Sequence, residues 1–546
     1  MIDKIQNKDP LKLTDIASLQ NLVMDCMNII ESQSEVITKQ TKEIQELKDE
    51  INRMKGEHGS LPPKPKVSHA TGQKPKIRPK RKLRKKRNKK ANLIVDEIIP
   101  CPIDKSKLPP DAVLQGYKDL IEQDIVFKRH NKLYRVPIYY SKQLGRTYTG
   151  ELPCSYSGQF GKQLKTWLQV FHHYGDMTQG RLHALMSNIG IDISTGTINN
   201  ILLSNTITVE QEATDILRSG LQHMDYAQMD GTKSFESGQT KATQIICTSL
   251  YSVYRTMDTK SRASIIGALQ AKLPSEIPLL YDATAIDLLK ASKVPKKDQR
   301  LLSELLGLDQ IYALADFEEH LSKKAPHLLK KESHAKVLAI LALNYYQAQT
   351  DFPIPQRLLT DAGHEYSSIV LFQILCWIHE ERHYKKMVPI LKVHQDQLEL
   401  VRCQIWEYYK KLLNFKELTL LQQKEQKEKL DQEFDEIFSQ QTIYKDLNKR
   451  LEKTFSRKEK LLQVLHFPQV PLHNNAAELA VRRKARKRDI SLHTMSAIGT
   501  RAQDAFMTVV ETAAKLGVNV FEYLRDLLSI ERTMIPLADL IAIKTQ

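Results

Sequence analysis

Residues 16–54 place a β-branched side chain at every seventh position, and this repeat strongly constrains how the N-terminal region can fold. The a positions of the heptads are Ile16, Val23, Ile30, Ile37, Ile44 and Ile51, and the d positions are Leu19, Cys26, Gln33, Gln40, Leu47 and Met54. β-Branched residues at a, with Leu at some d positions, favour a parallel two-stranded coiled coil. We therefore predict a homodimerisation helix over residues 14–56. The alternative is a helix that packs on its own chain.

Positive charge is concentrated in one segment. Residues 74–90 contain twelve Lys or Arg and no acid, and without them the net charge of +17 falls to +5. Prolines in and before this segment prevent a continuous helix, so we predict an extended linker over residues 57–92. A linker of this kind either binds DNA phosphates without reading bases, which we favour, or is only solvated. Its predicted DNA-binding residues are Lys80, Arg81, Lys82, Arg84, Lys85, Lys86 and Arg87.

Length and composition exclude several classes of protein. A chain of 546 residues suggests roughly three or four folded units. No apolar run reaches the ~18 residues of a membrane span, and the N-terminus lacks a signal-peptide pattern. The six cysteines include no Cys-x-x-Cys pair, which argues against a disulfide framework and a four-cysteine zinc site. We expect a cytoplasmic protein with a nucleic-acid partner and no membrane contact.

The region after the linker is expected to be β-rich. Residues 93–152 are rich in Val, Ile and Tyr, and the alternating segment KLYRVPIY at 132–139 predicts a strand. Only Cys101 could supply a thiolate ligand in this module, so we expect no zinc there.

Residues 153–210 change to helical spacing and suggest a helix-turn-helix. We predict one helix, a turn at Gly190 and a second helix capped by Ser194 or Thr195. Two short helices that only pack against their neighbours would give the same pattern. The side chains that could reach DNA bases in this geometry are Thr197, Asn199 and Asn200.

Residues 221–500 alternate strand-like and helical patterns, which predicts an α/β domain. The first strand of a predicted hairpin begins at Leu221 and ends at Asp230, and a turn-rich stretch follows at 234–240. Asp361 also follows an apolar run, so it is expected at a second strand end. Helical insertions are predicted at about 270–350 and 393–465.

A third acid lies on a later helix. Asn474 or Asn475 can cap this helix, and Glu478 faces the same side as Arg482, four residues on. Two aspartates at strand ends and a glutamate on a helix are the groups that two-metal phosphoryl transfer requires, because carboxylates bind hard divalent ions.

The C-terminal part carries a specific signature. HNNAAELAVRRKARKRD, followed by GTRAQDAFMTVVETAAKLGVNVFEYLRDLL, resembles the C-terminal signature of the insertion-sequence sixty-six family of bacterial transposases. QMDGT looks like the first-aspartate motif of this family, and LCWIHEERHYKK looks like its Cys-Trp-x-His-x-x-Arg segment. The order of zipper, basic linker, β module and paired helices is also similar.

The resemblance implies a multidomain α+β protein with an N-terminal coiled coil, a β-rich module and a helix-turn-helix-like region. An RNase H-like domain with helical insertions and a C-terminal helical region at 501–546 would follow. The resemblance carries the catalytic and metal-binding roles to Asp230, Asp361 and Glu478. Such DDE-type transposases nick DNA by water attack and join the freed 3′ hydroxyl to target DNA, using Mg²⁺ or Mn²⁺. The expected partners are the element's terminal repeats, target DNA, further copies of the chain and element-encoded helper proteins, in the bacterial nucleoid.

Three departures from the family pattern matter. His473 replaces a leading Asp, Gly231 stands where an acid is usual, and the paired cysteines of the zinc module are missing, so residues 93–152 would be a degenerate zinc finger. The missing cysteines suggest a divergent subgroup or a decayed transposase that only dimerises and binds DNA. The competitors of Asp361 as second acid are Asp282 and Asp316.

His379 to His383 form a literal His-Glu-x-x-His, the signature of zinc proteases. A protease would need a third ligand downstream, and the basic surroundings offer no reason for one. We prefer the interpretation that His379 and Arg382 lie near DNA phosphates, and we keep the metalloprotease as a third hypothesis.

A basic run directly follows Glu478. Such a run is usually a solvated helix face, but next to a metal site it could clamp the DNA backbone. The residues predicted to do so are Arg482, Arg483, Arg486, Lys487 and Arg488.

Overall fold

The computed structural model describes residues 16–54, 97–100 and 128–545, except 154, 155, 157, 293, 331 and 530. The predicted linker at 57–92, with its seven DNA-binding residues, lies outside the described residues, as do Cys101 and Cys154. The chain divides into two compact units, Lys39–Lys132 and the remainder.

The chain is a mixed α+β protein, as the sequence predicts. The strands are β1 (Ile138–Ser141), β2 (Arg146–Thr149), β3 (Ala227–Glu236), β4 (Gln239–Cys247), β5 (Ser252–Met257), β6 (Pro278–Tyr281), β7 (Gln310–Ala313), β8 (Arg357–Thr360) and β9 (Phe372–Leu375). The helices up to β8 are α2 (Ile16–Met54), α3 (Lys162–His173), α4 (Gln179–Asn188), α5 (Thr195–Leu203), α6 (Thr206–His223), α7 (Arg262–Leu269), η3 (Pro274–Glu276), α8 (Ala283–Ala291), α9 (Lys296–Leu305), α10 (Leu314–Lys324), α11 (Pro326–Leu329) and α12 (Glu332–Ala348). The later helices are η4 (His364–Tyr366), α13 (Trp377–Lys385), α14 (Lys392–Phe415), α15 (Leu420–Ser439), α16 (Lys445–Phe455), α17 (Lys458–Leu461), η5 (Gln463–Leu465), α18 (Asn475–Ser491), α19 (Ala497–Leu516), α20 (Val520–Leu527) and α21 (Leu537–Thr545).

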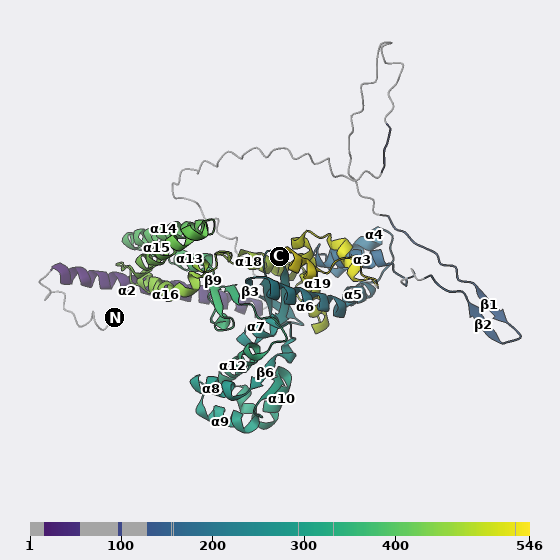
Figure 1. The fold of residues 1–546 in the computed structure, drawn as a ribbon, viewed down its shortest axis with the longest axis horizontal. Helices are drawn as coiled ribbons and strands as arrows, with labels where there is room; N and C mark the ends of the chain where they lie inside the picture. The colour runs from purple at the N-terminus through teal and green to yellow at the C-terminus, as the bar shows by residue number, and fades with distance from the viewer. Residues whose placement is uncertain are drawn as a thin grey trace, which may run out of the picture. The chain divides into compact units, whose positions relative to one another are not determined.

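Five strands form the central sheet in the order β5-β4-β3-β8-β9. Figure 1 labels β3 and β9 of this sheet. The strands β3, β4 and β5 form an antiparallel meander, whereas β8 runs parallel to β3 and β9 runs parallel to β8. The turn between β3 and β4 is tight because Ser237 and Gly238 both have positive φ, 47° and 79°, as two-residue hairpin turns require.

The two faces of the sheet pack against different helices. Met229 of β3 points into the main core, which includes residues of α6 and α7. On the other face, Ile245 packs against Ala480 of α18 and Met507 of α19. Because residues paired across strands share a face, Asp230, the partner of Ile245, lies on the α18 face.

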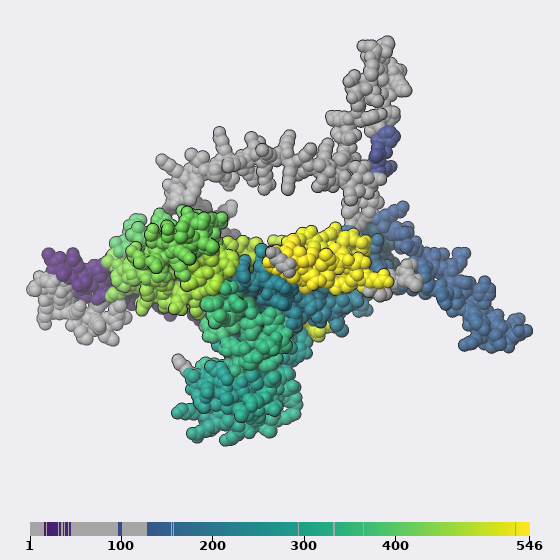
Figure 2. All heavy atoms as spheres, viewed as in Figure 1, coloured from purple at the N-terminus to yellow at the C-terminus, as the bar shows by residue number. Residues whose placement is uncertain are grey.

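Two largely helical segments are inserted in the chain, one before β8 and one after β9. Between β5 and β8 the chain forms the antiparallel pair β6–β7 with helices α7 to α12. The atoms of this segment form a continuous teal lobe in Figure 2. Between α13 and α18, helices α14 to α17 surround a second core that includes Trp377, Tyr408 and Phe434. Across residues 16–54 and 128–545, no helix has the length and apolar character needed to cross a membrane.

Asp25 and Asn28 of helix α2 contact a later segment of the same chain. Asn28, which is 5% exposed, donates to the carbonyl of Ile443 (3.3 Å) and accepts from the backbone N–H of Lys445 (2.8 Å), and Asp25 pairs with Lys445. These residues lie at heptad positions c and f, whereas the first four a positions remain exposed. The helix therefore packs on its own chain, which was the alternative to a dimer, but this packing leaves the a positions of the predicted dimer interface exposed.

Two predicted boundaries are wrong. Leu221 belongs to α6 and not to a strand, because it continues the buried stripe of Leu217 into the main core. The strand expected at 132–139 begins only at Ile138, because the preceding Pro137 has no N–H with which to continue the ladder.

Helix α18 is held by buried polar contacts on two sides. Asn474 precedes the helix, but its side chain donates to the carbonyl of Met229 in β3 (2.9 Å) and does not cap the helix as expected. Lys484, 3% exposed, pairs with Asp504 of α19 at 2.6 Å. The other Asp504 oxygen accepts from the backbone N–H of Thr256 (2.6 Å), which connects α19 and β5 to the same ion pair.

We expect Lys484→Ala to destabilise the fold, because it leaves the Asp504 carboxylate buried without its cation. Breaking a buried pair costs about 3–5 kcal/mol, and the free energy of unfolding measured in urea should fall by that amount. Lys290→Ala removes the exposed pair with Asp287 and is the control, with an expected change below about 1 kcal/mol. Equal effects of the two substitutions would contradict this account.

Candidate active site

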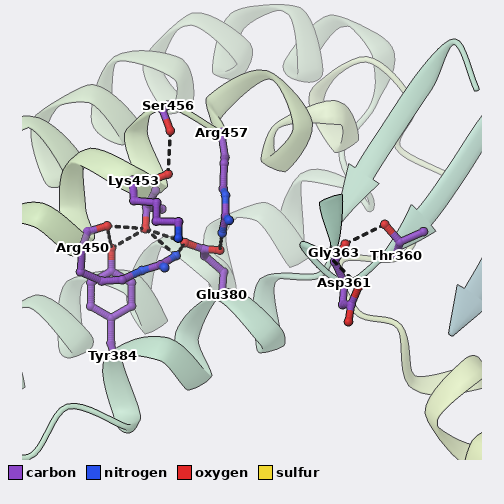
Figure 3. Close-up of polar contacts among 10 residues, drawn as sticks. Thr360, Asp361, Gly363, Glu380, Tyr384, Arg450, Lys453, Ser456 and Arg457 are labelled. Atoms are coloured by element: carbon purple, nitrogen blue, oxygen red, sulfur yellow. Dashed lines mark hydrogen bonds and ion pairs between the residues drawn. The ribbon is translucent and has the colours of Figure 1, made fainter. Parts of the chain in front are cut away.

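Two of the predicted acids stand side by side on neighbouring strands. The parallel register of β3 and β8 places Asp230 level with Asp361, which directly follows β8 as predicted. Asp230 lies within β3 and not at its end, because the strand continues into the hairpin with β4. Each carboxylate accepts a backbone N–H, Asp230 from Gly231 (2.7 Å) and Asp361 from Gly363 (3.0 Å; Figure 3).

The two aspartates interact electrostatically. Burial raises the pKa of Asp230, and the negative charge of Asp361 raises it further, while the Gly231 N–H, His379 and Lys260 act in the opposite direction. Repulsion between two partly buried carboxylates is what a bound divalent cation would offset, and oxygen is the donor that such cations prefer. The carboxylate oxygens of Asp230 and Asp361 are therefore suitable ligand atoms for a divalent metal ion.

Glu478 does not join the aspartate pair. Both of its oxygens lie 3.2 Å from Nη2 of Arg382, and Oε1 lies 3.8 Å from Nε2 of His379. Arg482 is 3.5 Å away, so the prediction that it shares a helix side with Glu478 is confirmed. Within the described ranges, no three His, Cys, Asp or Glu side chains form a group that could hold a metal ion. His379, which interacts with both Asp230 and Glu478, is the link between them.

Two charged residues that sequence reasoning missed also lie here. The Lys260 amine donates to the carbonyl of Gly231 (3.1 Å), beside Asp230. Burial raises the pKa of Tyr366, and the charges of Asp361, Asp230 and Glu365 raise it further, so all three carboxylates lie within electrostatic reach of its hydroxyl. No sequence pattern marks Lys260, because it follows β5 and only the folded sheet brings it to β3.

The competing second acid Asp282 has a structural role. It caps α8 by accepting the N–H of Ala285 (2.8 Å), and it also accepts from Asn344 (2.8 Å). Asp316 is exposed on α10, in the same inserted segment.

Glu380, the glutamate of the His-Glu-x-x-His sequence, belongs to a buried cluster of ion pairs. Glu380 is 3% exposed and accepts from Arg457 (2.9 Å) and from Arg450, as Figure 3 shows. It also accepts from Thr454 (2.6 Å). A carboxylate neutralised by two arginines cannot serve as the general base of a protease. The metalloprotease hypothesis therefore loses the residue on which it depends.

The basic run on α18 faces inward in part. Arg483 donates to the carbonyls of His173 (2.9 Å) and Tyr174 (3.0 Å), and Lys487, fully buried, donates to the carbonyl of His172. Burial lowers the pKa of Lys487 to about 8. These cations satisfy the C-terminal carbonyls of α3, which favour positive charge. Arg483 and Lys487 therefore bind carbonyls of the protein itself, and their predicted role in binding DNA is not supported.

Two of the other arginines of the run remain available to a ligand. The side chain of Arg482 is 67% exposed, and Arg486 is also exposed. Arg488 is partly buried and donates to the carbonyl of Lys233 (2.7 Å). Only Arg482 and Arg486 therefore present most of their charge to solvent.

The paired helices α4 and α5 flank Gly190, whose φ is +82°. Ser194, and not Thr195, caps α5 by accepting the N–H of Thr197 (3.1 Å). Two of the three proposed base-contacting side chains have internal partners, Thr197 with Ser194 (2.9 Å) and Asn199 with Gln179 (3.0 Å). Asn200 is exposed.

Comparison with known proteins identifies the family. Residues 343–502, which contain Asp361 and Glu478, match the sequence model of a family described as "Transposase IS66 family". A curated protein of Sinorhizobium fredii (strain NBRC 101917 / NGR234), "Uncharacterized protein y4jO", is 30% identical over 345 residues, covering 60% of this chain and 100% of the relative. No solved structure matches the chain. The chain belongs to the IS66 family of transposases, as the resemblance predicts.

The raised pKa of Asp230 predicts a pH-dependent stability. Below the ordinary pKa of 3.8 the Asp230 carboxyl is protonated in both the unfolded and the folded protein. Above 3.8 the unfolded chain releases the proton while the folded protein still holds it. The contribution of this proton to folding stability is therefore present at low pH and is lost as pH rises through the raised pKa. In Asp361→Asn the pKa of Asp230 should fall toward its ordinary value, and carboxyl NMR titration would measure the change. Asp316→Asn is the control. An unchanged titration of Asp230 in Asp361→Asn would refute the coupling.

Proposed function

We propose that this chain is a DDE-type transposase that cuts DNA strands and joins the freed 3′ ends to target DNA. The observation that carries this proposal is the level placement of Asp230 and Asp361 on neighbouring parallel strands, in a chain of the IS66 family. The sheet supports an RNase H-like domain, because its first strand is central, two antiparallel strands lie on one side and two parallel strands on the other.

Asp230 and Asp361 would hold Mg²⁺ or Mn²⁺, with Glu478 as the third ligand. When bound, the divalent ions would activate the attacking oxygen and stabilise the leaving one. Lys260 would hold the backbone beside Asp230, because its amine donates to the next carbonyl along the strand.

Arg382 and His379 would orient the scissile phosphate. The Arg382 side chain is 42% exposed, and it donates to both Glu478 and His379. A guanidinium pairs with phosphate as readily as with carboxylate, so an arriving DNA phosphate competes with Glu478 for Arg382. This exchange would free the Glu478 carboxylate to turn toward the two aspartates.

DNA would be bound by positive side chains outside the carboxylate site. The exposed Arg482 and Arg486 lie on the helix that carries Glu478, so they can contact the backbone near the scissile phosphate. The linker at 57–92 would add contacts that do not depend on base sequence.

One observation favours a second candidate, a decayed transposase that binds DNA without cutting it. Glu478 pairs with Arg382 and not with the aspartates, so the three acids are not assembled. The two candidates differ in a single respect, which is whether DNA brings Glu478 to the pair.

Mg²⁺-dependent nicking of a labelled duplex with the element's ends separates the two candidates. Wild type should nick, and Asp230→Asn and Glu478→Gln should each lower the rate at least about 10²-fold, because a catalytic metal supplies several kcal/mol to the transition state. Asp316→Asn, which alters an exposed carboxylate on α10, is the matched control and should cut normally.

DNA binding, measured by fluorescence anisotropy, should persist in both variants. Binding without nicking by the wild type would support the decayed protein. Normal nicking by Glu478→Gln would remove this residue from the catalytic set.

We also propose that α2 pairs with a second copy of the chain. Its a-position side chains Ile16, Val23, Ile30 and Ile37 are 75%, 55%, 53% and 63% exposed. A row of exposed β-branched residues at this spacing is typical of a coiled-coil seam, and the contact with Ile443 and Lys445 uses the opposite face.

Val23→Asp with Ile30→Asp should give a monomer, because the charges would be buried in the seam. Sedimentation velocity would measure the mass in solution. Asn21→Asp, at an exposed position outside the seam, should leave the dimer intact. A monomeric wild type would contradict the proposal.

A further inference from the structure

The loop between α18 and α19, residues 492–496, carries apolar side chains that face solvent. Leu492 is 67% exposed and Met495 is 74% exposed, and Ile498 in the first turn of α19 is 49% exposed. Isolated apolar residues are common on protein surfaces, but several on one short segment are typical of an interaction site.

The β3–β4 hairpin fixes the backbone of this loop. The N–H of Ser237 donates to the carbonyl of Thr494 (2.8 Å), and the N–H of Thr494 donates to the carbonyl of Phe235 (3.2 Å). The hydroxyl of Ser237 donates to the carbonyl of Met495 (2.8 Å). Leu492 has a φ of +62°, which a leucine rarely adopts, so the surrounding contacts hold it in that conformation. Because the loop is already ordered, a partner that covers it loses little conformational entropy on binding.

Helix α18 leads from the candidate active site to the loop. Before its first turn, Asn474 donates to the carbonyl of Met229 in β3 (2.9 Å), and near its end Arg488 donates to the carbonyl of Lys233 (2.7 Å). The loop contacts Phe235, two residues further along β3. The helix therefore runs beside β3 in the same direction as the strand, away from the aspartate pair.

The length of α18 sets where a bound duplex would meet the loop. Leu492 follows Glu478 by fourteen residues. An α-helix rises about 1.5 Å per residue, so this separation is roughly 21 Å. Successive base pairs are about 3.4 Å apart, so a duplex that lies along α18 would cover the separation with about six base pairs.

The exposed charges along this path are mostly positive. Arg482 and Arg486 of α18 are exposed, and so is Lys233 of β3. The exposed acid of α18, Asp489, lies 3.5 Å from Arg488, which offsets its charge. A polyanion is therefore attracted to the surface that ends at the loop, and this favours DNA over a protein surface as the occupant.

We propose that Leu492 and Met495 insert between base pairs of the bound duplex, about six base pairs from the scissile phosphate, and kink it. Apolar side chains such as Leu and Met can act as wedges of this kind, because they partly unstack a base step and bend the duplex by about 20–90°. Arg482 and Arg486 would hold the DNA backbone beside the wedge. This inference rests on the proposed function, because the carboxylate site sets the position of the DNA.

The test uses the full chain and duplexes with the element's end, with 2-aminopurine at one position at a time out to about ten base pairs from the cleavage site. The fluorescence of 2-aminopurine rises when the base leaves the stack, and energy transfer between dyes at the two duplex ends reports a bend. The loop variant, Leu492→Asn with Met495→Gln, makes both side chains polar at similar size. Met495→Leu keeps an apolar side chain. Leu420→Gln with Leu421→Asn, at exposed positions of α15, is the matched control.

We expect one step near the sixth base pair to brighten several-fold, and the duplex ends to approach each other, with wild type, Met495→Leu and the α15 control. The loop variant should give neither signal. All substituted side chains are exposed, so circular dichroism should show four folded proteins, and anisotropy should show that all four bind the duplex.

Bound DNA without brightening in the wild type, or brightening that the loop variant retains, would overturn the inference while nicking upholds the proposed function. Loss of both DNA binding and nicking in the wild type would overturn both.

Sedimentation velocity separates DNA from a second copy of the chain as the occupant of the loop. It would be measured without DNA in the background of Val23→Asp with Ile30→Asp, where the proposed α2 seam is removed. We expect the same mass with and without the loop substitutions. A mass that falls when they are added, with no response of 2-aminopurine in DNA, would assign the loop to a contact between copies and overturn the wedge.

Discussion

The fold around the candidate site depends on the buried cations of α18. Lys484 pairs with Asp504 of α19, while Arg483 and Lys487 satisfy the last carbonyls of α3. Lys484 and Lys487 are buried and Arg483 is partly buried, so loss of these contacts would cost free energy. One helix therefore joins the sheet, the C-terminal helices and the paired-helix region.

The candidate site consists of a formed pair and a third acid held apart from it. Asp230 and Asp361 are placed by strand register, which side-chain motion cannot change. Glu478 is placed by an ion pair with Arg382, which a phosphate can replace. Such an arrangement would couple completion of the site to the arrival of DNA, because without a phosphate Arg382 retains the glutamate.

Local features were the most predictable from sequence. The cap at Ser194, the turn at Gly190 and the approach of Arg482 to Glu478 each depend on residues within a few positions, where backbone preferences dominate. Long-range contacts were less predictable. The His-Glu-x-x-His pattern gives no sign that Glu380 would meet two arginines some seventy residues later. The basic run likewise gives no sign of which cations α3 would bury.

The sequence by itself determined the family, the mixed α+β class and the identity of the candidate acids, because these depend on residue types and short spacings. It also determined the helical repeat of residues 16–54. Only the tertiary structure decided that Asp230 and Asp361 stand level, that Glu478 pairs with Arg382, and which arginines of α18 face solvent. These outcomes depend on strand order and on burial, which bring together residues far apart in the sequence, and a linear pattern does not encode that proximity.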